Sequence, residues 1–201
     1  MAISKRVKNA LEGASWVRRM FEEGEELKRL HGAENVFDFS LGNPNLEPPS
    51  SLKKALKDLA DQPIIGMHRY MPNSGYIETR KAIAQYLTEE SGLPFSENHV
   101  VMTVGAAGGL NVSLKAILDE GDEVIVPSPY FMEFKFYIEN CSGKIRLVDT
   151  NEDFSLNIGE IEKAIGKRTK VVLINSPNNP TGVVYDQRSL EKLGELLNSK
   201  S

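Results

Sequence analysis

The sequence predicts an α/β fold, a three-layer αβα arrangement with a mostly parallel central sheet. Two observations carry this prediction. From residue 75 onward, short apolar runs alternate with longer segments in which apolar residues recur at helical spacing. The runs end in turns rich in Gly, Pro and Asn, and strands that alternate with helices in this way form βαβ crossovers with helices on both faces of the sheet.

The individual elements follow from the pattern in order along the chain. Val17, Met20, Leu27 and Leu30 recur at helical spacing, and Gly32 ends that helix. Gly and Pro separate the segments that follow, until the alternation of strand and helix begins. We expect a helix over 14–30, an extended segment over 36–41 and helices over 50–60 and 76–90, and then strands over 99–104, 123–126, 145–149 and 170–174, each followed by a helix, over 108–118, 131–140, 158–165 and 189–197.

Composition and charge exclude several classes of protein. A chain of 201 residues with 40% hydrophobic and 26% charged residues is ordinary for a globular protein and excludes global disorder. The formal net charge of −4 argues against nucleic acid or a membrane surface as a partner. The longest aliphatic run, Val171–Ile174, is far shorter than the ~20 residues of a membrane-spanning helix, and the N-terminus shows no secretory signal. Because Cys141 is the single cysteine, no internal disulfide can form, so we expect a cytoplasmic location.

The residues that follow the expected strands carry the functional information, because ligands of parallel sheets gather beyond the carboxyl ends of the strands. After the strand over 99–104, Gly105, Ala106 and Ala107 open a helix. Small residues let a ligand approach the free N–H groups at a helix start, which suits a phosphate. The spacing of the glycines matches neither the dinucleotide fingerprint nor a P-loop. A plain tight turn between strand and helix is the alternative.

Two later turns add an aromatic ring and a constrained amide. Tyr130 follows the strand over 123–126 through Pro127 and Pro129, where it can stack on a flat heterocycle or, alternatively, pack as a core aromatic under a loop. The strand over 170–174 is followed by Asn175-Ser176-Pro177-Asn178-Asn179-Pro180-Thr181-Gly182. Prolines constrain the backbone of this run, and Asn179 offers an amide that can donate to an anionic oxygen. We interpret the run as part of a ligand site.

The run over 175–182 resembles the Asn-x-Pro-x-Asn-Pro-Thr-Gly signature of class I/II pyridoxal-phosphate-dependent aminotransferases, of the aspartate aminotransferase fold type. Four shorter segments resemble the same family in the same order: Ser40–Pro44, the stretch from Tyr70 through Gly75 and Arg80 to Ala84, Thr103–Ala107, and Pro129-Tyr130. The resemblance covers nearly the whole chain. It implies the large-domain fold of these transferases, fold type I, incomplete at the C-terminus. It also implies an N-terminal arm with part of the small domain over 1–48, and the N-terminal portion of the cofactor-binding large domain over 49–201.

The resemblance implies pyridoxal 5'-phosphate as the cofactor and a role for each residue that would contact it. Gly105, Ala106 and Ala107 would bind its phosphate through backbone N–H groups. Ala107 stands where the family often has Ser, Thr or Gln, so one side-chain contact to the phosphate is missing. Tyr130 would stack on the pyridine ring, and Asn179 would donate a hydrogen bond to the 3-oxygen of the cofactor.

The resemblance also implies the contacts to substrate and partner. Gly42 would offer its backbone to the substrate carboxylate, which Asn179 would hold as well. Tyr70 would reach the phosphate bound by the partner subunit, so the full-length parent is expected to be a homodimer. No catalytic residue is expected in this chain, because the lysine that forms a Schiff base with the cofactor is expected beyond Ser201. The 201-residue chain alone is therefore expected to be inactive.

The activity implied for the parent is transfer of an amino group between an amino acid and a 2-oxo acid. Two alternatives stay open at this point. The first is another pyridoxal-phosphate enzyme of the same fold, such as a C–S lyase or a cyclopropane-forming synthase, which shares the Asn-Pro-Thr-Gly segment. The second is a non-catalytic ligand-binding module.

Overall fold

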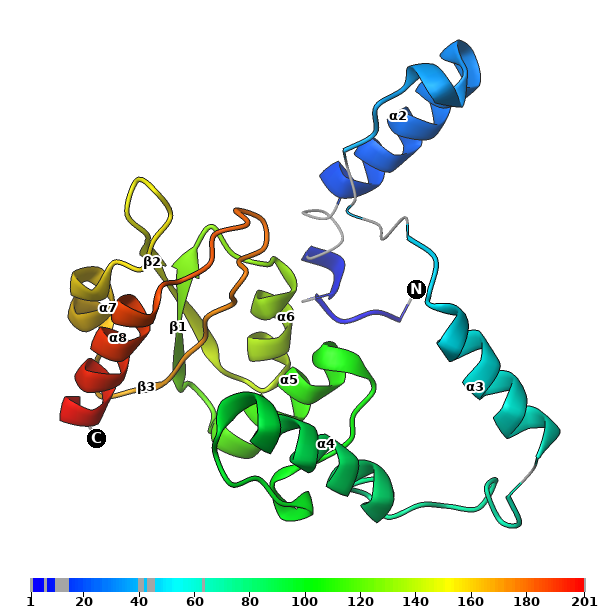
Figure 1. The fold of residues 1–201 in the computed structure, drawn as a ribbon. Helices are drawn as coiled ribbons and strands as arrows, with labels where there is room; N and C mark the ends of the chain where they lie inside the picture. Colours follow the sequence, from blue (N-terminus) through cyan, green and yellow to red (C-terminus); the bar gives the residue numbers. More distant parts are fainter. Residues whose placement is uncertain are drawn as a thin grey trace. The chain divides into compact units, whose positions relative to one another are not determined.

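The chain divides into two compact units, residues 1–69 and residues 70–201. The structure is a computed structural model that describes residues 2–5, 7–9, 15–39, 42, 46–62 and 64–200 (Figure 1). The expected domain boundary between residues 48 and 49 stays a prediction. The two compact units of this chain do not show where the domains of a larger protein begin and end.

The first unit consists of separate helices whose described side chains are all at least partly exposed. Helix α2 covers Ser15–His31, the short 3₁₀ helix η1 covers Ala33–Asn35, and α3 covers Ser50–Asp61. These confirm the helices expected over 14–30 and 50–60. Gly32 follows α2 with φ of 84°, a conformation that glycine adopts without cost and that ends the helix as expected. Of the extended segment expected over 36–41, residues 36–39 are irregular, and residues 40 and 41 lie outside the described residues.

The second unit contains a parallel sheet of three strands. Strand β1 covers Glu123–Ser128, β2 covers Lys144–Asp149 and β3 covers Thr169–Val172. Their order is β2-β1-β3, and β1 pairs with both neighbours in parallel. Three of the four expected strands are therefore confirmed, together with their parallel arrangement.

Helices cover both faces of this sheet. Figure 1 shows α5 and α6 on one side of the strands and α7 and α8 on the other. The helices expected from residue 76 onward are confirmed, with shifts of a few residues at their ends. They are α4 at Ile77–Ser91, α5 at Gly105–Ile117, α6 at Glu133–Asn140, α7 at Ile158–Ala164 and α8 at Gln187–Lys200, and a 3₁₀ helix, η2, lies at Glu97–His99.

The core of the second unit consists of two clusters separated by β1, because alternate residues of a strand point to opposite faces. The α5–α6 cluster contains Leu114, Leu118, Val124, Val126, Phe134, Ile138 and Cys141. The α7–α8 cluster contains Ile125, Val148, Leu156, Ile161, Ala164, Tyr185 and Leu193. These clusters complete the expected three layers. Because the three strands are parallel, their carboxyl ends lie at one edge of the sheet.

The strand expected over 99–104 was wrong. Residues 97–99 form η2, and residues 100–103 belong to no helix and to no strand of the sheet that the structure describes. The N–H of Met102 donates instead to the Ser74 carbonyl oxygen at 3.0 Å, and the side chains of Val101 and Val104 are 60% and 94% exposed. A strand needs a ladder of hydrogen bonds to a neighbouring strand, which an apolar pattern alone does not provide.

Candidate functional site

The carboxyl edge of the sheet gathers two of the expected site loops. Strands β1 and β3 are parallel neighbours, so the loop with Tyr130 and the loop with Asn179 leave the same edge of the sheet. Tyr130 is half-buried and packs against the α5–α6 cluster, as does Leu110 of α5. The start of α5, the Tyr130 loop and the Asn179 loop are thus carried by elements that share this sheet and its core.

The start of α5 has the geometry of an anion site. The helix begins at Gly105, three residues before the expected start, and Gly105 has φ of 65° with open space around its Cβ position. The first intrahelical acceptor is Val104, whose carbonyl oxygen receives the Gly108 N–H at 3.3 Å. The N–H groups of Ala106 and Ala107 precede that bond, and both residues are exposed. Ala107 adds only a methyl group, so this end of the helix can bind an anion through its backbone alone.

The loop after β3 holds Asn179 at the surface. Asn179 is exposed, and its backbone N–H donates to Asn175 Oδ1 at 3.0 Å. The loop closes on itself: the Asn178 N–H donates to the Val183 carbonyl oxygen at 2.8 Å, and the Gly182 N–H donates to the Asn178 carbonyl oxygen at 2.7 Å. The sequence pattern indicated Asn179 but not Asn178, which is buried and makes most of the hydrogen bonds of this loop.

Tyr70 lies at the start of a segment that is docked on residues 100–103. Its side chain is fully exposed. The bond from the Met102 N–H to Ser74 links this segment to the one that leads into α5. Gly75, at φ of 94°, packs so closely on Met102 that a Cβ would collide with it. Arg80 secures the same turn, because its guanidinium donates to the carbonyl oxygens of Gly75, at 3.2 Å, and Glu97, at 2.7 Å.

Gly42 belongs to the first unit. It is exposed, and no atom lies within 4 Å of the position that a Cβ would take, so its backbone is open to a ligand. The other residues of the Ser40–Pro44 segment lie outside the described residues.

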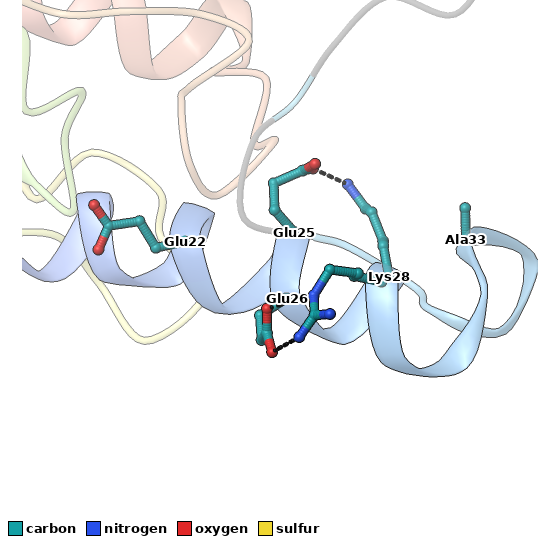
Figure 2. A pocket seen from close by; sticks show the side chains of 6 residues that line it. Glu22, Glu25, Glu26, Lys28 and Ala33 are labelled. Atoms are coloured by element: carbon teal, nitrogen blue, oxygen red, sulfur yellow. Dashed lines mark hydrogen bonds and ion pairs between the residues drawn. The ribbon is translucent and has the colours of Figure 1, made fainter.

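A hollow along α2 is lined by none of the expected site residues. It is lined by Glu22, Glu25, Glu26, Lys28, Arg29 and Ala33. Ion pairs connect these charges along the helix, from Glu25 to Lys28 at 3.0 Å and from Glu26 to Arg29 at 2.6 Å. Dashed lines mark such pairs in Figure 2. The hydrogen bond from Arg29 lowers the pKa of Glu26 below its ordinary value. We interpret the hollow as the solvated face of a charged helix, since both of its bases form ion pairs with acids of the same helix.

Neither a metal site nor a membrane-spanning helix occurs in the described part of the chain. No three His, Cys, Asp or Glu side chains there are grouped to hold a metal ion. Among the same residues, every helix is too short or too polar to cross a membrane. The remaining polar groups are the free N–H groups at the start of α5 and, at the carboxyl edge of the sheet, the ring of Tyr130 and the amide of Asn179. Together they are suited to a flat, anionic organic ligand.

Comparison with known proteins decides the family. The model for "Aminotransferase class I and II" matches residues 34–201. The chain belongs to this family. The resemblance inferred from the sequence motifs is therefore confirmed, and with it the αβα fold.

Individual family members match over most of the chain. It is 31% identical over 194 residues to a probable aspartate aminotransferase of Methanocaldococcus jannaschii, covering 96% of this chain and 48% of that protein. It is 35% identical over 165 residues to a probable aspartate/prephenate aminotransferase of Aquifex aeolicus, covering 81% and 41%. A crystal structure of an aminotransferase from Eubacterium rectale superposes with a TM-score of 0.94 at 34% identity, covering 100% of this chain and 51% of that one. The chain thus spans about half the length of its aminotransferase relatives.

Proposed function

We propose that the parent protein, meaning the full-length protein that contains this chain, transfers an amino group between an amino acid and a 2-oxo acid, with pyridoxal 5'-phosphate as its cofactor. One observation carries the proposal beyond family membership. Tyr130 and Asn179 follow parallel neighbouring strands at one edge of the sheet, and α5, whose start is open, packs through Leu110 and Leu114 on the cluster that Tyr130 also contacts. The names of the relatives make aspartate the first amino donor to test.

The residues at this edge fit the chemistry of the cofactor. Pyridoxal phosphate combines a phosphate, a flat aromatic ring and a ring oxygen that carries negative charge. The N–H groups of Ala106 and Ala107 suit the phosphate, the ring of Tyr130 suits a stacked heterocycle, and the amide of Asn179 suits the oxygen. When bound, the cofactor supplies an electron sink for the negative charge that forms at the α-carbon of the amino acid.

The residues of this chain would bind and orient rather than carry out proton transfer. Asn179 would donate to the ring oxygen and hold its negative charge in place, and the substrate carboxylate would be bound by Asn179 and by the open backbone at Gly42. Tyr70, exposed at the start of its docked segment, would reach the phosphate held by a partner subunit, which makes the active assembly a homodimer. We place this enzyme in the cytoplasm. The lysine that makes the covalent bond to the cofactor would be contributed by a part of the parent outside this chain.

The proposal is tested by changing Asn179→Ala in the parent protein. Loss of a hydrogen bond to a charged oxygen is expected to weaken pyridoxal phosphate about 10- to 100-fold, since such bonds contribute roughly 1.5–3 kcal/mol. Equilibrium titration of the cofactor measures the affinity, and formation of a new amino acid from aspartate and a 2-oxo acid measures the transfer. Asn198→Ala is the matched control, because Asn198 lies on α8, outside the start of α5, the Tyr130 loop and the Asn179 loop.

The same assays separate the alternatives. Unchanged cofactor affinity in Asn179→Ala would remove Asn179 from the site. Ammonia or sulfide release without a new amino acid would identify a lyase of the same fold, and a parent that does not bind pyridoxal phosphate would favour a non-catalytic module.

A further inference from the structure

Asn178 has an unusual environment for a polar side chain. It is 7% exposed and is the one buried polar residue among the residues that the structure describes. It directly precedes Asn179, whose side chain is exposed. A buried amide is costly unless its hydrogen bonds are made inside the protein, so the partners of Asn178 explain its position.

Those partners are the residues that follow it in the same loop. Asn178 Oδ1 accepts from the Thr181 N–H at 3.3 Å and from Thr181 Oγ1 at 3.0 Å. Its backbone N–H donates to Val183 and its carbonyl oxygen accepts from Gly182. Its Nδ2 donates to the hydroxyl oxygen of Tyr185 at 3.4 Å. The side chain and backbone of Asn178 together therefore hold residues 178–185 in one conformation.

Tyr185 connects this network to the core. It is 6% exposed and belongs to the α7–α8 cluster with Ile125, Ile161 and Leu193. Burial raises the pKa of its hydroxyl above the ordinary value, while the hydrogen bond with Asn178 opposes that shift. Its backbone N–H also donates to Ser176 Oγ at 3.1 Å, on the other side of the loop. The ring of Tyr185 thus anchors the loop in the core, and its hydroxyl reaches Asn178.

Asn179 lies between two anchors. Asn175 Oδ1 accepts the backbone N–H of Asn179, and the preceding residue, Asn178, is held by its hydrogen bonds to Thr181 and Tyr185. The Asn179 amide itself makes no hydrogen bond with the residues that the structure describes. A fixed backbone with an uncommitted amide is the arrangement expected of a side chain that is oriented in advance for a ligand.

We propose that Asn178 and Tyr185 form a positioning pair that orients Asn179 toward the negatively charged ring oxygen of the cofactor. The inference rests on the proposed function, because it assigns the pair to the binding site for pyridoxal phosphate. Asn178 acts through Asn179 and does not touch the cofactor. Loss of the pair lets Asn179 move, so the hydrogen bond that stabilises the charged oxygen weakens although Asn179 itself is unchanged.

The test is a visible-absorption pH titration of pyridoxal phosphate bound to the parent protein. In Asn179→Ala the pKa read from the bound cofactor is expected to rise by about one unit, because a hydrogen bond to its charged form is lost. Asn178→Ala is expected to raise it in the same direction by about half as much. In the double variant, the Asn178 substitution is expected to add nothing, because the residue through which it acts is already absent.

Two further variants keep the test decisive. Tyr185→Phe removes only the hydroxyl and keeps the buried ring, so it carries the same prediction if Asn178→Ala does not fold. Ser155→Ala is the matched control. Ser155 Oγ accepts from Asn151 Nδ2 at 2.9 Å in the loop after β2, so the substitution removes a hydrogen bond from a loop that does not contain Asn179. We expect no pKa change in this control.

The outcomes separate the inference from the function on which it rests. A shift in Asn179→Ala but none in Asn178→Ala or Tyr185→Phe overturns the positioning pair and leaves the proposed cofactor contact intact. A shift from Asn178→Ala that persists in the double variant also overturns it, since Asn178 would then act without Asn179. No shift in Asn179→Ala overturns the proposed contact and the positioning pair together.

Discussion

Helices α3 and α7 both carry apolar residues three or four positions apart, but in the described part of the chain only α7 contributes to a core. In α7, Ile161 and Ala164 are buried in a cluster with residues of β1 and α8. In α3, the apolar side chains at positions 52, 56 and 59 lie on one face and are 48%, 60% and 46% exposed. The pattern that predicts an amphipathic helix therefore does not predict what covers its apolar face.

The same contrast separates the two units. Residues 70–201 enclose two clusters on the two faces of β1, whereas no described side chain of residues 1–69 is buried. Burial of apolar surface supplies most of the free energy that keeps helices of this length folded. The stability of the second unit is thus carried by its own residues, and the apolar face of α3 adds little within the chain described.

The contributions of α3 and α7 to stability can be compared by truncating one apolar side chain in each helix. Ile161→Ala is expected to lower the free energy of unfolding by about 2–5 kcal/mol, because it leaves a cavity in the α7–α8 cluster. Leu56→Ala in α3 is expected to change it by less than about 0.5 kcal/mol. Urea denaturation followed by circular dichroism measures both, and similar losses in the two variants would show that α3 is packed against a core.

The first turns of α8 and α3 also differ, with a smaller expected effect on stability. Asp186 accepts from the Ser189 N–H at 2.9 Å and from Ser189 Oγ at 2.8 Å at the start of α8, whereas α3 follows Pro49 with no side-chain cap. These hydrogen bonds lower the pKa of Asp186 below its ordinary value of 3.8. Their stabilising effect is therefore fully present above that value and is lost as the pH falls through the lowered pKa.

Asp186→Asn tests this dependence. The melting temperature of the variant is expected to lie slightly below that of the unchanged chain at neutral pH, and the difference is expected to shrink as the pH falls below the ordinary pKa of the aspartate. Thermal melts at a series of pH values measure it. A constant difference at all pH values would show that the charge of Asp186 has no part in starting α8.

Features set by local pattern were predictable from the sequence. The turn signals after residues 126 and 174 placed Tyr130 and Asn179 at strand ends, and both strands are present. The strand expected over 99–104 failed because strand formation depends on a distant neighbour that the local pattern does not contain. Asn178 was missed for the same reason. Its importance comes from burial and from Tyr185, and the only local signal was a second asparagine between two prolines.

We propose that pyridoxal phosphate binds at the carboxyl edge of the sheet and not at the opposite edge. Hydrogen–deuterium exchange of the parent protein, with and without pyridoxal phosphate, distinguishes the two edges. We predict that the cofactor slows amide exchange at the start of α5, residues 105–109, and in the two loops at the carboxyl edge, residues 130–131 and 175–182. We predict no change at residues 118–122 and 165–168, which precede β1 and β3 at the opposite edge. Protection at the opposite edge, or none at the carboxyl edge, would contradict the assignment of the cofactor site.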